Sequence, residues 1–384
     1  MSTAGSFAGL TAKGWILMDE TKAPMVLALH FAALSLPTML VSGPAGVRTD
    51  RVGCERVLIQ AQWALLGAAL LGALSIPVLD GQAQVLMLLA STLLVGIAGA
   101  YELTARNKYC ALLVDDNAEL APFLTSFSVV FNVGKLVGPL LGGWLITLTG
   151  PATALTLDAA TYLMPIASVI WLLHPRTELE QRSSPGEKAS LRVAWRECGS
   201  TLRHVLMFTG LMCVVGFFHP GLGPLIAARE LGDAPMDLAV FTSVLALGSI
   251  SGGLLLQRNS HRFCGRPSLT LAGFALVTAV AQLGMAVGGS EPFLLTMTLL
   301  IGAGTAGLLS SSNLITQVGS TQILRGRMAG LGQIAFLGGG GLSGLIAAVL
   351  TDTMGLQATF AISGSLGVVL ALLEIWRRGG SVLN

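Results

Sequence analysis

The sequence predicts an all-α integral membrane protein with about twelve membrane-spanning helices, arranged as two bundles of six. Three observations lead to this prediction. Of the 384 residues, 53% are hydrophobic and only 11% are charged, whereas a soluble domain carries about 25% charged residues. Apolar segments of roughly 20 residues, the length that crosses a bilayer, recur along the chain. One long polar stretch lies near the middle. Lipid is therefore the expected solvent for most of the protein surface.

The apolar segments follow one another with short turns between them, and these turns contain Gly, Pro, Asn or Asp, as at Asp80–Gly81. We expect helices near 3–18, 25–45, 57–78, 84–105, 120–148, 152–174, 201–226, 236–256, 268–288, 292–316, 327–351 and 355–376. The first segment has about sixteen residues, which is fewer than a bilayer requires. We therefore expect a truncated helix 1 and a true start upstream of Met1.

The polar stretch divides the chain into an N-terminal six-helix bundle (1–174), a connecting loop (175–200) and a C-terminal six-helix bundle (201–384). The loop is mixed in charge and contains Ser, Pro and Gly. Its last part, from about Ala189 to Cys198, is expected to form a helix that lies on the membrane surface.

Basic residues gather in alternate loops, and the loops between them carry mainly acidic residues. Basic residues mark the cytoplasmic side of a multi-pass membrane protein, so both termini are predicted to be cytoplasmic, in a bacterial-type inner or plasma membrane. The net charge of only +2 argues against a nucleic-acid partner. Outside the connecting loop, the basic residues on the predicted cytoplasmic side are Arg48, Arg51, Arg56, Arg106, Lys108, Arg258, Arg262, Arg266, Arg325, Arg327, Arg377 and Arg378.

A charged motif follows the second apolar segment. It consists of Gly46, Asp50, Arg51, Gly53 and Arg56. The glycines suit a tight turn that needs positive φ. The Asp50 carboxylate can cap a helix or pair with an arginine. The alternative is a generic charged turn between two helices.

A second motif lies in the fifth apolar segment and consists of Gly134, Gly138, Pro139, Gly142 and Gly143. Glycines spaced by four residues line one face of a helix and let a neighbouring backbone approach closely. Pro139 removes a backbone hydrogen bond and permits a bend. The alternative is a packing face with no bearing on transport.

The two motifs resemble the signature loop and the helix 5 glycine motif of the major facilitator superfamily. Glu55 departs from the loop pattern, and Thr125 stands where an earlier glycine is expected. Further positions resemble the enterobactin-exporter-like, multidrug efflux branch: Trp15, Thr21, Pro37, Thr104–Arg106, Asn132, Asn313, Gln317 and Arg325–Arg327.

This resemblance implies the major facilitator fold and a secondary active transporter. It would export a small molecule, either a hydrophobic drug-like compound or a siderophore, by alternating access and proton antiport. The open alternatives are a solute importer, a lysolipid-type transporter, and a membrane sensor or scaffold that does not transport.

Ionisable residues inside membrane segments are costly and are functional candidates. Glu102 and Arg106 are four residues apart and share a helix face, and Asp50 is expected near the same membrane side. We expect these three residues to form a cluster that differs between the inward-open and outward-open states. Proton binding at Glu102 would shift the equilibrium between these two states. The alternative is a static Glu102–Arg106 pair at the membrane surface.

A substrate cavity is expected around Lys13, Asn132, Lys135 and Asp158, which all lie on predicted N-terminal helices. Two lysines would suit an anionic or acidic substrate. The alternatives are that Lys13 pairs with Asp158 as a structural contact, or that Lys13 extends to the membrane interface.

No cofactor, metal or enzymatic activity is expected. The five cysteines form no CxxC or Cys/His ligand set. The sequence contains no GxxxxGK[ST] loop and no HExxH or GxSxG motif. The run Gly338–Gly341 lies inside the eleventh apolar segment, where it predicts a hinge or a packing face. The expected partners are a small-molecule substrate, protons and the bilayer.

Overall fold

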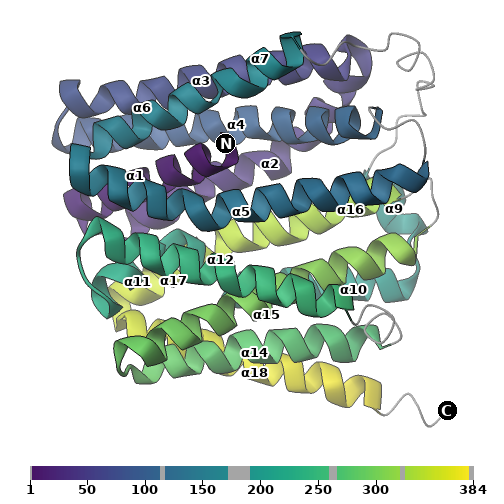
Figure 1. The fold of residues 1–384 in the computed structure, drawn as a ribbon. Helices are drawn as coiled ribbons and strands as arrows, with labels where there is room; N and C mark the ends of the chain where they lie inside the picture. Colours follow the sequence, from purple (N-terminus) through teal and green to yellow (C-terminus); the bar gives the residue numbers. More distant parts are fainter. Residues whose placement is uncertain (1, 113–116, 172–190, 259–265, 321–324, 380–384) are drawn as a thin grey trace. The chain divides into compact units, whose positions relative to one another are not determined.

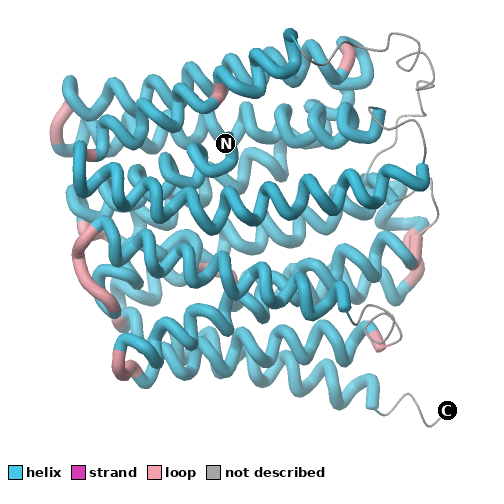
Figure 2. The backbone as a smooth tube through the Cα atoms, in the orientation of Figure 1, coloured by secondary structure: helices cyan, strands magenta, loops and turns pink. Residues whose placement is uncertain are grey.

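In the computed structural model, the described residues are 2–112, 117–171, 191–258, 266–320 and 325–379. Their regular structure is entirely helical (Figures 1 and 2). Eleven spans within these ranges are long and apolar enough to cross a membrane. The predicted all-α membrane class is therefore confirmed.

The first half contains α1 (Ser2–Thr21), α2 (Pro24–Val52), α3 (Cys54–Val78), α4 (Gly81–Leu112), α5 (Asn117–Thr149), α6 (Pro151–Thr161) and α7 (Leu163–Trp171). The second half contains α9 (Leu191–Glu197), α10 (Ser200–Gly216), α11 (His219–Glu230), α12 (Pro235–Arg258), α14 (Pro267–Val287), α15 (Glu291–Val318), α16 (Arg325–Gln333), a π-helical turn η1 (Ile334–Gly338), α17 (Gly339–Met354) and α18 (Leu356–Gly379).

The chain forms two compact units. Unit 1 consists of Met1–Lys22, Ala33–Glu187 and Ala234–Val240, and unit 2 consists of Ala23–Ala32, Lys188–Asp233 and Phe241–Asn384. In unit 1, α1 packs against α5 and α6, and α3 packs against α4 and α6 (Figure 1). In unit 2, α14 packs against α15 and α18, and α10 packs against α15 and α17.

Helix α1 is longer than the sequence predicts. It has 20 residues instead of about sixteen, because its last turn continues through Thr21, whose hydroxyl donates to the Leu17 carbonyl at 2.6 Å. At 1.5 Å per residue this gives about 30 Å. The helix is nevertheless not one of the eleven candidate spans.

The charged motif after the second segment is more helical than expected. Helix α2 continues through Gly46 to Val52, so the prediction of a turn across the whole motif is wrong. The turn is confined to Gly53, which has φ 97° and ψ 139°, a backbone conformation essentially limited to glycine. Gly46 needs no such freedom because it lies inside the helix.

Three apolar segments that the sequence presents as single helices are interrupted. The break between α6 and α7 lies at Tyr162, four residues after Asp158 and three before Pro165, which lacks an N–H for the Thr161 carbonyl. The break between α10 and α11 lies at Phe217 and Phe218. The third segment holds the π-helical turn η1 between α16 and α17.

The C-terminal part of the connecting loop forms α9. Its Ala194 and the following Cys198 are buried in the apolar core of unit 2, together with Leu202, Leu206 and Met328. Residues 175–190 of the expected loop lie outside the described residues. The same is true of Arg262 and of the C-terminal residues 380–384.

Candidate functional site

The glycine motif of α5 faces α1. A Cβ atom on Gly134 would lie 2.8 Å from the Thr3 Cβ, and one on Gly142 would lie 2.9 Å from the Ala8 Cα. Both distances are shorter than a carbon–carbon contact allows, so only glycine permits this approach. The contacts advance in the same direction along both helices, which therefore run parallel.

The remaining motif residues of α5 divide between two neighbours. A Cβ on Gly138 would lie 2.6 Å from the Phe7 Cβ, again on α1. Gly143 instead faces the start of α12, where its Cβ would lie 2.6 Å from the Ala239 Cβ. Pro139 is buried, and α5 continues through it without a break.

Lys13 is buried in the helix packing of unit 1. Its side chain is only 3% exposed. The ammonium Nζ donates a hydrogen bond to the Ser91 Oγ of α4 at 2.7 Å, and Ser91 in turn donates to the Ala68 carbonyl of α3 at 2.7 Å. Gly72 provides the space, because its Cβ would lie 2.8 Å from the Ser91 Oγ and 3.1 Å from the Lys13 Cε.

Asp158 lies on α6 and faces α1 about one turn before Lys13. It is 6% exposed, and its carboxylate fits against the Cα of Gly9, where a Cβ would overlap with it. Gly9 is one turn before Lys13 on α1. The two charges are near enough to interact electrostatically, although these two described residues form no direct ion pair. The Asp158 Oδ1 is buried and has no hydrogen-bond partner in the described part of the chain.

The structure places Lys135 elsewhere. It follows Gly134, which faces Thr3, whereas Lys13 lies ten residues further along the parallel helix α1. That separation is about 15 Å along the axis. Asn132 lies one turn before Lys135 on the side away from Lys13. The four expected cavity residues therefore form a Lys13–Asp158 group and a Lys135–Asn132 group within unit 1.

Glu102 and Arg106 form the expected pair near the end of α4. The Arg106 guanidinium contacts the Glu102 carboxylate at 3.0 Å, and the side chains are 24% and 13% exposed, respectively. The side chain of Asp50 lies outside the described part of the structure, while Arg51 and Arg56 are exposed. Two of the three predicted members of the cluster are thus in contact.

Sequence reasoning missed a histidine–carboxylate contact in unit 2. The His204 Nε2 of α10 lies 2.8 Å from both carboxylate oxygens of Glu374 on α18. Glu374 is 4% exposed. An isolated acidic residue inside the last apolar segment was the available signal, because a buried carboxylate requires a partner.

The described residues form helices as their only regular structure, and eleven spans among them are long and apolar enough to cross a membrane, which defines a multi-pass membrane protein. The family model described as "Transmembrane secretion effector" matches residues 1–378. The chain therefore belongs to this family of the major facilitator superfamily, which confirms the predicted resemblance to its efflux branch. A transporter is also not an enzyme, as predicted.

Individual proteins agree with this assignment. The multidrug efflux pump Tap of Mycobacterium tuberculosis strain H37Rv is 25% identical over 379 residues, covering 94% of this chain and 87% of Tap. The uncharacterized transporter YfiS of Bacillus subtilis is 24% identical, covering 92% and 84%. A variant of the nucleoside transporter NupG has the same fold, with a TM-score of 0.74, 13% identity and coverage of 97% and 98%. The predicted major facilitator fold is thereby confirmed.

Proposed function

We propose that this transporter exports a hydrophobic drug-like compound or a siderophore by alternating access, coupled to proton antiport. The observation that carries the proposal is the buried Lys13–Ser91–Asp158 group. The efflux activity named for the Tap relatives supports the direction of transport. In this proposal both termini are cytoplasmic, and residues 1–174 and 201–384 are the two bundles that rock about the substrate, with 175–200 as the connection between them.

The chemistry of the buried group suits proton coupling. A charged side chain inside an apolar bundle is costly and is retained where it serves transport. Lys13 has one described acceptor, the Ser91 hydroxyl, and the Asp158 Oδ1 has none in the described chain. A carboxylate oxygen that lacks a donor can accept a proton, and protonation would remove the negative charge that faces Lys13. Proton binding would thereby change the electrostatics between α1 and α6.

The other predicted residues take complementary roles. Glu102 and Arg106 respond to the conformational state at the end of α4, together with the charged motif around Gly53. Lys135 and Asn132 contact the acidic part of a substrate. These two groups lie on different helices from Asp158, so their effects on coupling and on substrate affinity can be separated by mutation.

The test is extrusion of a panel of lipophilic dyes from efflux-deficient cells, with and without an uncoupler. We expect extrusion by the native chain that the uncoupler abolishes. Asp158→Asn and Glu102→Gln should each abolish uncoupler-sensitive extrusion, because each removes a titratable carboxylate. Lys135→Gln should instead weaken the apparent affinity for acidic dyes.

Asp352→Asn is the matched control, because Asp352 is an exposed carboxylate on α17. It should leave extrusion unchanged. Accumulation of dye inside the cells would indicate an importer and overturn the proposal. Full proton-driven extrusion by both carboxylate variants would show that neither residue couples transport to protons.

A further inference from the structure

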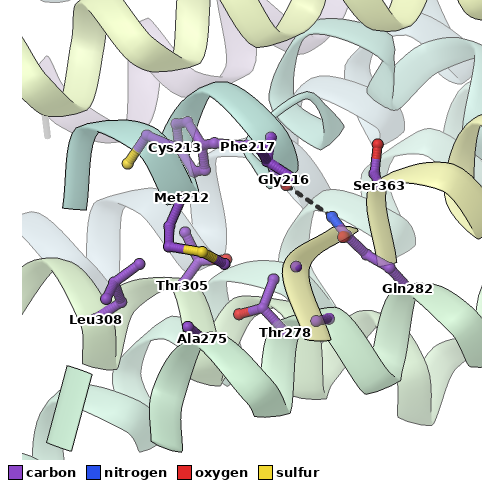
Figure 3. A pocket seen from close by; sticks show the side chains of 13 residues that line it. Met212, Cys213, Gly216, Phe217, Ala275, Thr278, Gln282, Thr305, Leu308 and Ser363 are labelled. Carbon is purple, nitrogen blue, oxygen red and sulfur yellow. Dashed lines mark hydrogen bonds between the residues drawn. The ribbon is translucent and has the colours of Figure 1, made fainter. Parts of the chain in front are cut away.

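The break between α10 and α11 leaves a backbone carbonyl without its helical partner. In an α-helix the Gly216 carbonyl would accept from the N–H of the residue four positions later, but that residue is Pro220, which has no N–H. The side chain of Gln282 on α14 takes this place. Its Nε2 donates to the Gly216 carbonyl at 2.7 Å (Figure 3). Gln282 is only 1% exposed, so this bond is deeply buried.

A small cavity of about 20 Å³ adjoins this bond in unit 2, between α10, α14, α15 and α18. Figure 3 shows Gln282, Thr278, Thr305 and Ser363 among the side chains that line it. The Thr305 hydroxyl is buried and has no hydrogen-bond partner in the described chain, and the residue is only 7% exposed. A buried hydroxyl without a partner is destabilising, and a bound molecule with a hydrogen-bonding group would satisfy it.

We infer that the cavity holds an ordered water molecule, which binds the Thr305 hydroxyl and the polar atoms of Gln282 and Ser363. A polar cavity needs about 10–15 Å³ and two to four polar partners to hold a water, and this cavity meets both conditions. The remaining lining is apolar, including Met212 and Leu308, and no lining residue is charged. A cation would lack charge compensation in such a site, so the ligand is neutral.

The water gives the break a physical role. Backbone groups that a proline releases inside a membrane helix require side chains or water as replacement partners. Here Gln282 binds the released carbonyl, and the water connects Gln282 to α15 and α18. Phe217, the first residue of the break, packs against Phe336 of η1 with ring centroids 4.8 Å apart. The site therefore holds the end of α10 at the break through exchangeable hydrogen bonds, as a hinge requires, and it does not depend on the identity of the substrate.

Radiolytic hydroxyl-radical labelling of the native full-length chain in detergent tests for the water directly, because a bound water produces radicals where it lies. Met212 and Cys213 line the cavity but are only 5% and 1% exposed. We expect oxidation of both residues. Met285, which is 1% exposed and does not line the cavity, is the control and should stay unmodified. Labelling of all three residues equally, or of none, would overturn the inference.

The direction in which one substitution changes the melting temperature tests for the bound water independently. Thr305→Val replaces the hydroxyl by a methyl group of similar size. If the cavity holds water, the variant loses a water ligand and its melting temperature falls. If the cavity is dry, the variant removes an unsatisfied hydroxyl and its melting temperature rises.

The control is Thr298→Val on the same helix, where the hydroxyl donates to the Leu294 carbonyl at 2.9 Å.

The double variant Thr305→Val/Gln282→Leu should lose less stability than the sum of the losses of the two single variants, because both side chains bind one water. Replacing sodium by choline in the buffer should not change the melting temperature. A sodium-dependent melting temperature that Thr305→Val removes would identify a cation and contradict the inference.

Discussion

The two units bury different kinds of polar groups. Unit 1 buries two opposite charges within its helices, Lys13 and Asp158, whereas the α10–α11 break of unit 2 is surrounded by an amide, a hydroxyl and an imidazole, those of Gln282, Thr305 and His219. The buried charge of unit 2, Glu374, lies near the end of α18 and contacts a histidine. Because a buried charge costs far more than a buried amide, unit 1 is the place to look for coupling, and unit 2 the place to look for a hinge.

Close helix packing, in contrast, is common to both units. In unit 1 three glycines of α5 (Gly134, Gly138 and Gly142) face α1, and in unit 2 Gly248 and Gly252 of α12 face the backbone of α15. In membranes, small residues permit close approach and van der Waals contact drives association. The difference between the units therefore lies in their buried polar groups and not in how their helices associate.

The largest effect is expected for the buried charges of unit 1. Lys13→Met leaves Asp158 buried without its nearby positive charge, which should destabilise the fold by about 3–5 kcal/mol. Adding Asp158→Asn should restore most of this stability, because no uncompensated charge remains, while transport stays abolished. Thermal unfolding in detergent and dye extrusion measure the two quantities. Equal stability of the single variant and the native chain would remove the distinction between the units.

The next largest effect should be the same in both units. Gly138→Leu in α5 and Gly252→Leu in α12 should each destabilise by about 1–3 kcal/mol or more through overpacking. Gly67→Leu and Gly253→Leu are the controls, since no atom lies within 4 Å of the added Cβ at either position. Melting temperatures of purified variants provide the comparison. A cost confined to one unit would show that close packing is not a shared property.

An effect of similar size is expected at the His204–Glu374 contact of unit 2. His204→Ala removes the hydrogen bond to Glu374, which should cost about 1.5–3 kcal/mol because the acceptor is charged and buried. His204→Gln keeps a donor and should cost less. Thermal unfolding at fixed pH distinguishes the two variants. If neither variant lowers the melting temperature, the contact contributes little, and unit 2 depends on buried charge less than its geometry indicates.

The last comparison concerns two glycines of the charged motif in unit 1, Gly53 and Gly46, and Gly253 of α12 in unit 2, and it includes the smallest effects. Gly53→Ala should cost about 1–3 kcal/mol because φ is 97°. Gly46 and Gly253 lie within helices and have open space at the added Cβ. Gly46→Ala and Gly253→Ala should therefore each stabilise the fold by roughly 0.5–1 kcal/mol. Urea or thermal unfolding measures these opposite signs. If Gly46→Ala destabilises the fold, the result would support the wider turn that the sequence predicts.

The sequence predicted much of the fold, since hydropathy locates membrane helices without knowledge of their neighbours. The expected segments correspond to the observed helices, with the largest errors where helices end or break. Pro220 and Pro165 were visible in the sequence, yet the apolar runs around them look continuous. A break in a membrane helix depends on whether another helix supplies replacement hydrogen bonds, and a local pattern does not contain that information.

The candidate site was predicted less completely. Lys13, Asp158, Glu102 and Arg106 stood out because charge in an apolar run is rare. Their grouping did not follow from that signal, as the distance between Lys13 and Lys135 shows. Ser91 and Gln282 carried no signal, because single neutral polar residues are common in apolar helices.

The sequence alone determined the membrane class, the approximate spans, the superfamily and the positions of the charged residues, because each of these depends on composition or on local spacing. Only the tertiary structure decided which polar groups meet. The rotation of α1 brings Lys13 to Ser91, 78 residues away, and the packing of α14 brings Gln282 to the Gly216 carbonyl, 66 residues away. Such partners are chosen by helix rotation and close packing, which arise from the sum of many weak contacts across the folded chain.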